Sequence, residues 1–171
     1  MSRLETPNSL NLTVAVLALA ALVFVPGLAL ADHHEGGDVA SQVKAKIMND
    51  NNYNRENLMD AEGTTSMHGS MEFWSSGGLV QWVAPDAPLS KYESFSINPK
   101  HIKVIELPGG EAAVAMYYSE GSMQVEGGPL VSHYMTRATQ VFVKEDGEWK
   151  VRAAHWSPIA AGSGTSQSSL D

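Results

Sequence analysis

Residues 129–158 read PLVSHYMTRATQVFVKEDGEWKVRAAHWSP, and this stretch decides the fold. Two runs of alternating apolar and polar residues flank Glu145-Asp146-Gly147. Such alternation predicts strands that bury one face, and an Asp-Gly pair between two of them predicts a β-hairpin. The sequence therefore predicts a long antiparallel hairpin with one apolar face.

Two loop lengths fit this turn, and each puts different side chains on the inner face. A three-residue loop, with Gly147 in the left-handed position, pairs Arg137 with His155. A two-residue Asp-Gly loop shifts the register by one residue and places Arg137 opposite Trp156. We favour the three-residue loop because it collects on one face the apolar side chains of Val141, Val143, Trp149 and Val151. This register predicts an inner wall that is apolar near the turn and polar at its far end, where His133 also lies.

Helical patterns come before the strands. Asp38 is a suitable N-cap for a helix whose apolar residues are Val39, Val43 and Ile47. The Asn-rich cluster at 49–52 is expected to end this helix, and a second short helix is expected at 54–61.

After Ser70 the residue pattern changes from helical to that of short strands. Besides the hairpin, strands are expected at 71–74, 79–83, 94–97, 102–107 and 113–120. Asn98-Pro99 is expected to interrupt the third and fourth of these. Helices followed by strands predict an α+β fold, in which a curved antiparallel sheet wraps the N-terminal helices.

The first 31 residues have the pattern of a signal peptide. Arg3 precedes an almost wholly apolar run from Leu12 to Leu30, and Ala29-Leu30-Ala31 is a small-x-small cleavage pattern. The alternative is an uncleaved anchor, because about 18 apolar residues span a bilayer. We favour cleavage after Ala31, a periplasmic or secreted protein, and no stable membrane insertion afterwards. The segments 32–37 and 162–171 are expected to be a flexible leader and a disordered tail.

Composition excludes several classes of function. The 171-residue chain has a formal net charge of −8 and no basic cluster, so nucleic acid is not an expected partner. The absence of cysteine excludes disulfides, a thiol nucleophile and a thiolate metal site. The histidines show no spacing typical of a metal centre. No metal and no cofactor is therefore expected.

The run from Thr136 to Val151, together with His155-Trp156-Ser157, resembles the C-terminal hairpin of SnoaL-like proteins of the nuclear transport factor 2-like superfamily. It is also similar to the calcium/calmodulin-dependent kinase association domain. The resemblance implies a SnoaL-like domain at 38–161, folded as a cone with a cavity at its open end. That superfamily contains isomerases, hydrolases, cyclases, dehydratases and proteins that only bind or oligomerise, so the fold leaves the chemistry open.

Catalytic patterns of this superfamily do not match clearly. An isomerase arrangement needs hydroxyl or acidic donors opposite a carboxylate base. Tyr117 or Tyr118 are candidate donors and Asp60 or Glu72 candidate bases, but their spacing matches no isomerase motif. Whether the protein is an enzyme stays open at this point.

Arg137 is the first candidate site residue, because a guanidinium on an inward face needs an anion or several acceptors. Its partner is either a ligand carboxylate or an internal carboxylate such as Glu120 or Asp60. His133 and His155 are candidate general bases beside it, and the alternative for each is a structural histidine bonded to a backbone carbonyl.

Aromatic side chains are expected to complete a ligand-binding wall. Neighbouring residues on a strand face opposite sides, so at most one of Tyr117 and Tyr118 lines a cavity. Core packing is the alternative role for each of the expected wall residues Trp74, Trp82, Tyr117 and Tyr118.

Two functions fit these features. The first is an exported pocket protein that binds a small, mostly apolar molecule with an anionic or carbonyl group, and transforms it if acid/base chemistry operates. The second is a non-catalytic oligomerisation or scaffold module, in which Phe142 and Trp156 on the outer sheet face form a dimer seam. A homodimer is compatible with both and is expected.

Overall fold

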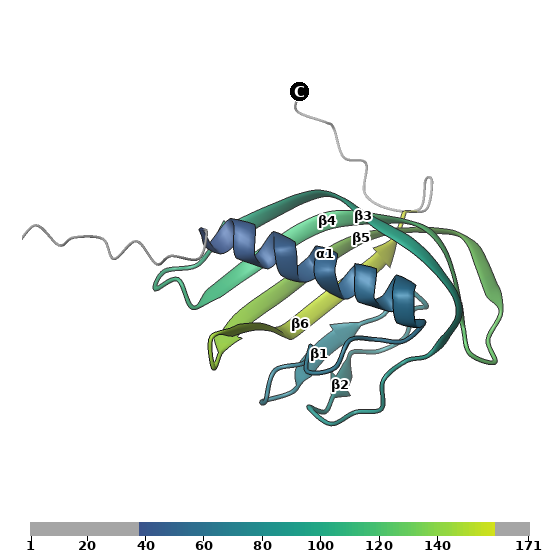
Figure 1. Ribbon diagram of the computed structural model, residues 1–171, viewed down its shortest axis with the longest axis horizontal. Helices are drawn as coiled ribbons and strands as arrows, with labels where there is room; N and C mark the ends of the chain where they lie inside the picture. The colour runs from purple at the N-terminus through teal and green to yellow at the C-terminus, as the bar shows by residue number, and fades with distance from the viewer. Residues whose placement is uncertain (1–37, 160–171) are drawn as a thin grey trace, which may run out of the picture. The chain divides into compact units, whose positions relative to one another are not determined.

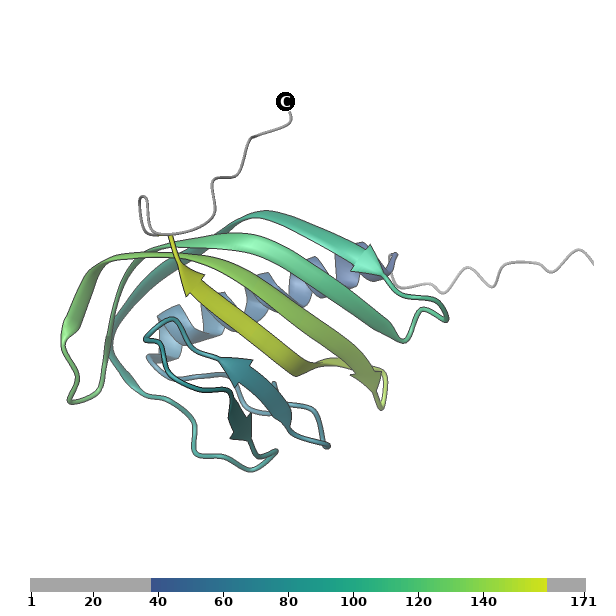
Figure 2. The same ribbon diagram turned by 180° about the vertical axis from the view of Figure 1, so that it is seen from behind.

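The computed structural model describes residues 38–159, which form one helix and one six-stranded sheet (Figure 1). The elements are α1 (Val39–Asn57), β1 (Ser70–Phe73), β2 (Gln81–Val83), β3 (Tyr92–Glu106), β4 (Ala112–Val125), β5 (Leu130–Glu145) and β6 (Glu148–Pro158). The strand order is β2-β1-β6-β5-β4-β3, and Figure 2 shows the long strands curving around α1. The predicted signal peptide (1–31), leader (32–37) and tail (162–171) lie outside the described residues. No helix within 38–159 has the length and apolar character needed to cross a membrane.

The predicted α+β class, a curved sheet packed on an N-terminal helix, is confirmed. One detail of the sheet differs from the prediction. β1 runs parallel to β6, with Glu72 beside Ala154 and Phe73 beside His155, while the other neighbouring strands are antiparallel. The sheet is therefore mixed. β1 follows α1 in the chain and lies next to β6 in the sheet.

A single helix replaces the two that were expected. Asp38 caps it as predicted, since its side chain accepts a hydrogen bond from the Ser41 amide at 2.6 Å. The Asn-rich cluster does not end it, because Asn51 is buried and its Nδ2 donates to the Ile97 carbonyl at 3.0 Å. This tertiary bond outweighs the low helix propensity of asparagine. The helix instead ends at Asn57, and Leu58 follows in the left-handed conformation.

β3 is also longer than expected, because it continues through Asn98-Pro99. Proline lacks an amide donor and is tolerated at the edge of a sheet. β3 is the edge strand next to β4, so Pro99 leaves no inner ladder incomplete. The irregularity falls just after it, in a bulge between Lys100 and Lys103.

The C-terminal hairpin has the register that we did not favour. Asp146 and Gly147 both have positive φ, 51° and 82°, and form a two-residue turn that pairs Lys144 with Trp149. A further register shift between Val141 and Phe142 then pairs Arg137 with Ser157. The predicted pairing of Arg137 with His155 is therefore wrong. The inner face carries the other alternating set of β5, which is Thr136, Ala138, Gln140 and Phe142.

The core joins α1 to this inner face. Val43 and Ile47 of the helix belong to one buried cluster with Ala113 and Ala115 of β4 and, from the hairpin, Ala138, Phe142, Trp149, Val151 and Ala154. Trp149 also donates through Nε1 to Gln42 Oε1 at 3.0 Å, which ties the hairpin to the helix.

β4 bends at Gly121, where its backbone passes close to β3. Gly121 has a φ of 148°, and a Cβ at this position would overlap the Ser96 carbonyl oxygen. The register of β4 against β5 shifts between Gly121 and Met123. Only glycine fits such a close backbone approach, and bulges of this kind curve a sheet.

We expect Gly121→Ala to lower the free energy of unfolding by more than about 3 kcal/mol, because the added methyl group cannot fit without moving β3. Gly109→Ala is the matched control: Gly109 has a φ of 97° but open space around it, so only the backbone term of about 1–2 kcal/mol applies. Urea unfolding measures both. Equal losses would show that the close approach to Ser96 is not what requires glycine.

Candidate functional site

A cavity of about 330 Å³ lies between the inner sheet face, α1 and the segment that leads from β2 to β3. Most of its wall is apolar or aromatic, with contributions from Ile47, Trp74, Leu89, Phe95, Tyr117, Phe142 and Trp156. The rings of Trp74 and Trp156 are stacked, with centroids 5.2 Å apart. Tyr92 and Phe95 make a tilted pair at 4.9 Å.

Three carboxyl groups interrupt this wall, those of Asp50, Asp60 and Glu72, whereas the described lining contains no lysine, arginine or histidine. Asp50 has its own cation, because Lys46 Nζ lies 2.7 Å from its Oδ1. Burial raises the pKa of Asp50 even so, and the Lys46 charge opposes that shift.

Glu72 is a carboxyl without a partner of its own. It occupies an inward position of β1 and is only 5% exposed. Within residues 38–159 it makes no ion pair, and the Ser70 hydroxyl is the hydrogen-bonding group beside it. Burial raises its pKa, the nearby Asp60 charge raises it further, and the Ser70 hydroxyl favours the charged form. Such a group is suited to taking up and releasing a proton.

Asp60, by contrast, accepts hydrogen bonds from three donors. Tyr92 Oη donates to its Oδ1 at 2.6 Å, Asn54 Nδ2 donates at 3.0 Å, and the Ser90 amide lies 3.3 Å from its Oδ2. Burial, and then the Asp60 charge, raise the pKa of Tyr92 far above its ordinary value. The Tyr92 hydroxyl therefore stays protonated and keeps donating to Asp60.

Tyr117 and Gln140 form a second buried polar pair. Tyr117 Oη donates to Gln140 Oε1 at 2.8 Å. Burial raises the pKa of Tyr117, so this hydroxyl also remains protonated. Tyr134 lies on the same wall, and its hydroxyl receives a long contact of 3.3 Å from Ser75 Oγ.

The prediction that Arg137, His133 and His155 line one cavity is wrong. All three are exposed, and none belongs to the cavity wall. Arg137 lies beside Tyr118 of β4 and Ser157 of β6, and the His155 ring packs on Phe73 at 5.4 Å. The two-residue turn places the other alternating set of β5 inward and so turns Arg137 outward. His155 faces outward because of the register shift between Val141 and Phe142, which adds one residue to β6 between Val151 and Ala153. The alternative ion pair of Arg137 with Glu120 or Asp60 is not formed within residues 38–159.

The aromatic predictions divide between the two faces. Trp74 and Tyr117 lie on the cavity wall, as expected. Tyr118 is 47% exposed on the other side of β4, in agreement with the expectation that at most one of the two tyrosines faces inward. Trp82 does not line the cavity either, because its ring lies against Gly69.

Sequence reasoning underrated Glu72, Asp60 and Tyr92. It considered Asp60 and Glu72 as bases but gave them no place in the site. One signal was available: Glu72 is a charged residue between the apolar Met71 and Phe73 of a short strand. Their meeting with Tyr92 depends on the long connection between β2 and β3.

A metal centre has no basis in this part of the chain. Among residues 38–159, no three histidine, aspartate or glutamate side chains gather closely enough to hold a metal ion.

Comparison with known proteins identifies the family of this chain. A family model described as a SnoaL-like domain matches residues 55–161. An NTF2-like protein of unknown function from Pseudomonas putida is 14% identical, with 71% of this chain and 88% of that chain covered and a TM-score of 0.49. A putative Ca/calmodulin-dependent kinase II association domain from Exiguobacterium sibiricum is also 14% identical, with 75% and 99% covered and a TM-score of 0.48. A putative ketosteroid isomerase from Shewanella frigidimarina is 23% identical, with 70% and 91% covered and a TM-score of 0.35. No curated protein matches the chain.

Glu72→Gln should make the protein more stable at neutral pH, by about 1–2 kcal/mol, because it removes a buried carboxylate without a partner. The pKa of Glu72 is raised above its ordinary 4.5. The contribution of this group to the free energy of unfolding is therefore fully present below pH 4.5 and is lost as the pH rises through the folded pKa. The advantage of the variant should therefore vanish in acid. Thermal unfolding across pH measures this, with the exposed Glu126→Gln as control. An advantage that does not change with pH would contradict the assignment.

Proposed function

Because the chain belongs to the SnoaL-like domain family, we propose that it binds a small, mostly apolar molecule beneath its curved sheet and shares a proton with it through Glu72. The observation that carries this proposal is the Glu72 carboxyl, 5% exposed and without an ion pair, on the wall of a cavity. A buried charge of this kind is costly and is expected to have a functional role.

The cavity suits a ligand of modest size. Its volume of about 330 Å³ is near the lower end of the range of about 300–1,000 Å³ that is usual for small-molecule sites. Stacked and tilted rings form much of the wall, and polar groups are few. Such a wall gains affinity from apolar contact and specificity from one or two polar contacts.

An anionic ligand, which the sequence suggested through Arg137, is not part of this proposal. The cavity wall within residues 38–159 holds three carboxyl groups and no basic side chain. A ligand carboxylate would therefore meet like charges and find no cation to pair with.

The site of action is proposed from the N-terminal pattern alone. Residues 1–31 carry the apolar run and small-x-small pattern of a cleaved signal peptide, so we propose that the protein works in the periplasm or outside the cell. The mature protein, purified from the exported fraction, is accordingly the form to use for binding, and its mass should place Asp32 first. A mature mass that includes residues 1–31 would contradict cleavage.

A thermal-shift screen of small ketones, alcohols and amines on this protein should find at least one stabilising class. A ligand at about 100 times its Kd adds about 2.7 kcal/mol to the free energy of unfolding. Calorimetry of that ligand in buffers of different ionisation enthalpy should show a proton taken up or released. Glu72→Gln should abolish the proton transfer, whereas Glu126→Gln should preserve it. Absence of any stabilising compound, or a proton transfer that survives Glu72→Gln, would refute the proposal.

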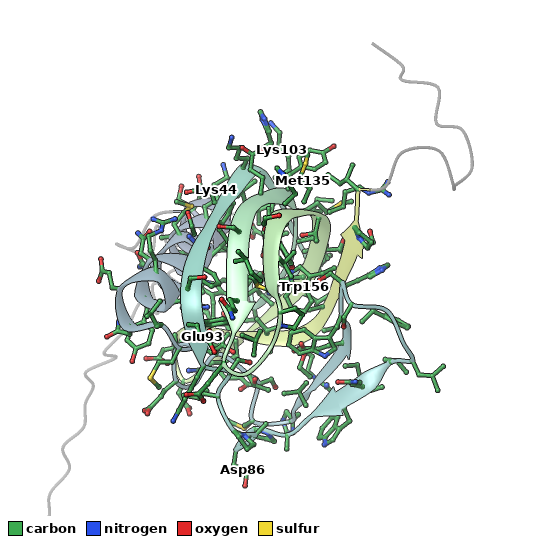
Figure 3. The ribbon with its side chains drawn as sticks, turned by 90° about the vertical axis from the view of Figure 1, so that its right-hand side faces the viewer. Lys44, Asp86, Glu93, Lys103, Met135 and Trp156 are labelled. Carbon is green, nitrogen blue, oxygen red and sulfur yellow. The ribbon has the colours of Figure 1, made fainter. Side chains whose placement is uncertain are left out.

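Homo-oligomerisation is a second candidate function, favoured by the outer face of the sheet. Figure 3 shows Lys103 and Met135 together at the top of the sheet, far from Asp86 in the loop below. Large apolar side chains stand exposed on this face, including Ile105 at 56%, Met116 at 50%, Tyr118 at 47% and Met135 at 46%. An apolar face of this kind is typical of an interface.

The seam expected at Phe142 and Trp156 is wrong, because Phe142 is 1% exposed and both residues line the cavity.

Met116→Lys should therefore convert a homodimer into a monomer, because it replaces an exposed apolar side chain of the outer face by a second charge opposite Lys103. Met67→Lys is the control, since Met67 is 55% exposed but lies outside the sheet strands. Light scattering after size exclusion gives the masses. A monomeric wild type, or a dimer that survives Met116→Lys, would exclude this interface.

A further inference from the structure

We infer that the ligand's polar group is a protonated amine, held by the Glu72 carboxylate and enclosed by aromatic rings of the cavity. The inference rests on the proposed function and names the ligand class for the same site. It follows from three independent features of the wall: its hydrogen-bond donors, its charge and its rings.

The first feature is that four hydrogen-bond donors on the wall are already used inside the protein. Tyr92 Oη and Asn54 Nδ2 both donate to Asp60, and Asn51 Nδ2 donates to the Ile97 carbonyl. Tyr117 Oη donates to Gln140. The Glu72 carboxylate, by contrast, is a buried acceptor with no ion pair among the described residues and only the Ser70 hydroxyl beside it. A ligand that brings donors complements this carboxylate, and an ammonium does so whereas a ketone does not.

The second feature is the uncompensated negative charge. Lys46 neutralises Asp50, but the donors to Asp60 are all neutral groups, and Glu72 has none of standard geometry. Asp60 is close enough to Glu72 to disfavour its ionisation. A cation between them would relieve both the repulsion and the cost of burying the charges.

The third feature is the set of aromatic faces around these carboxyl groups. The stacked Trp74 and Trp156 and the tilted pair of Tyr92 and Phe95 line the same cavity. An ammonium is attracted to the face of an aromatic ring, more strongly where water is excluded. Apolar rings with one buried carboxylate therefore favour an amine that carries an alkyl or aryl body.

The direction of proton transfer distinguishes an amine from a carbonyl ligand. An ammonium favours ionised Glu72, so its binding should release a proton near the folded pKa of that group. A ketone accepts a hydrogen bond from the protonated acid, so its binding should take a proton up. The other titratable groups on the wall are Asp50 from α1, Asp60 from the connection after it, Tyr92 from β3, Tyr117 from β4 and Tyr134 from β5. Both aspartates are retained in the Glu72→Gln variant, so a response that this substitution removes belongs to Glu72.

The test compares four probes that share one alkyl chain: hexylammonium, hexanol, 2-hexanone and hexanoate. On the full exported protein, calorimetry should rank hexylammonium first, with proton release, and show no binding of hexanoate. Glu72→Gln should lower the affinity for hexylammonium by about tenfold or more, which is the contribution of a charge-assisted hydrogen bond. The affinity for hexanol should stay nearly unchanged. The exposed Glu126→Gln should change neither.

Two results would overturn the inference, and they differ in what else they refute. Binding of 2-hexanone or hexanol in preference to the amine, with a proton transfer that needs Glu72, would leave the proposed function standing and exclude the amine. Binding of none of the four probes, together with an empty thermal-shift screen, would remove both. Amine binding that is unchanged in Glu72→Gln would place the cation elsewhere and also overturn the assignment.

Discussion

The turn at Asp146-Gly147 fixes which side of the sheet becomes the cavity wall. Both residues have positive φ, so the turn has two residues and sets the pairing of β5 with β6 from its closed end. Because successive side chains on a strand point to opposite faces, this pairing sends Gln140 and Phe142 inward and Arg137 outward. The shift after Phe142 realigns the strands without reversing that choice over most of β5. The positions of Gln140 and Phe142 in the cavity wall depend on this choice, whereas Trp156 reaches the wall because of the register shift in β6.

The inner face contains a polar arrangement that folding stability alone does not explain. Asp60 receives three donors and Asp50 a lysine, so these carboxyl groups have partners. Glu72 is as buried as a core residue, and within the described residues it has no ion pair and only the Ser70 hydroxyl beside it. An uncompensated buried carboxyl costs stability, whereas a glutamine of similar shape would cost less. The contrast between Glu72 and its neighbours is the strongest structural argument for a ligand.

The two faces of the sheet can serve different purposes without competing. The cavity lies on the side of the sheet that α1 covers, while Ile105, Met116 and Tyr118 lie on the opposite side. Contact between two outer faces would leave the Glu72 carboxyl and the rings around it untouched. Ligand binding and self-association are therefore compatible within one chain, and neither requires residues of the other.

The sequence by itself determined the family, the α+β class, the helix cap at Asp38 and the opposite orientations of Tyr117 and Tyr118. These follow from local patterns: strand alternation, capping chemistry and the run around the Asp-Gly turn. Only the tertiary structure decided the hairpin register, the continuation of α1 through Asn51, and the isolation of Glu72. Each of these depends on contacts between residues far apart in the chain, such as Asn51 with Ile97 and Asp60 with Tyr92. The choice between two registers one residue apart is made by the two-residue turn and by the shift between Val141 and Phe142, and the alternation of the sequence is compatible with either loop length.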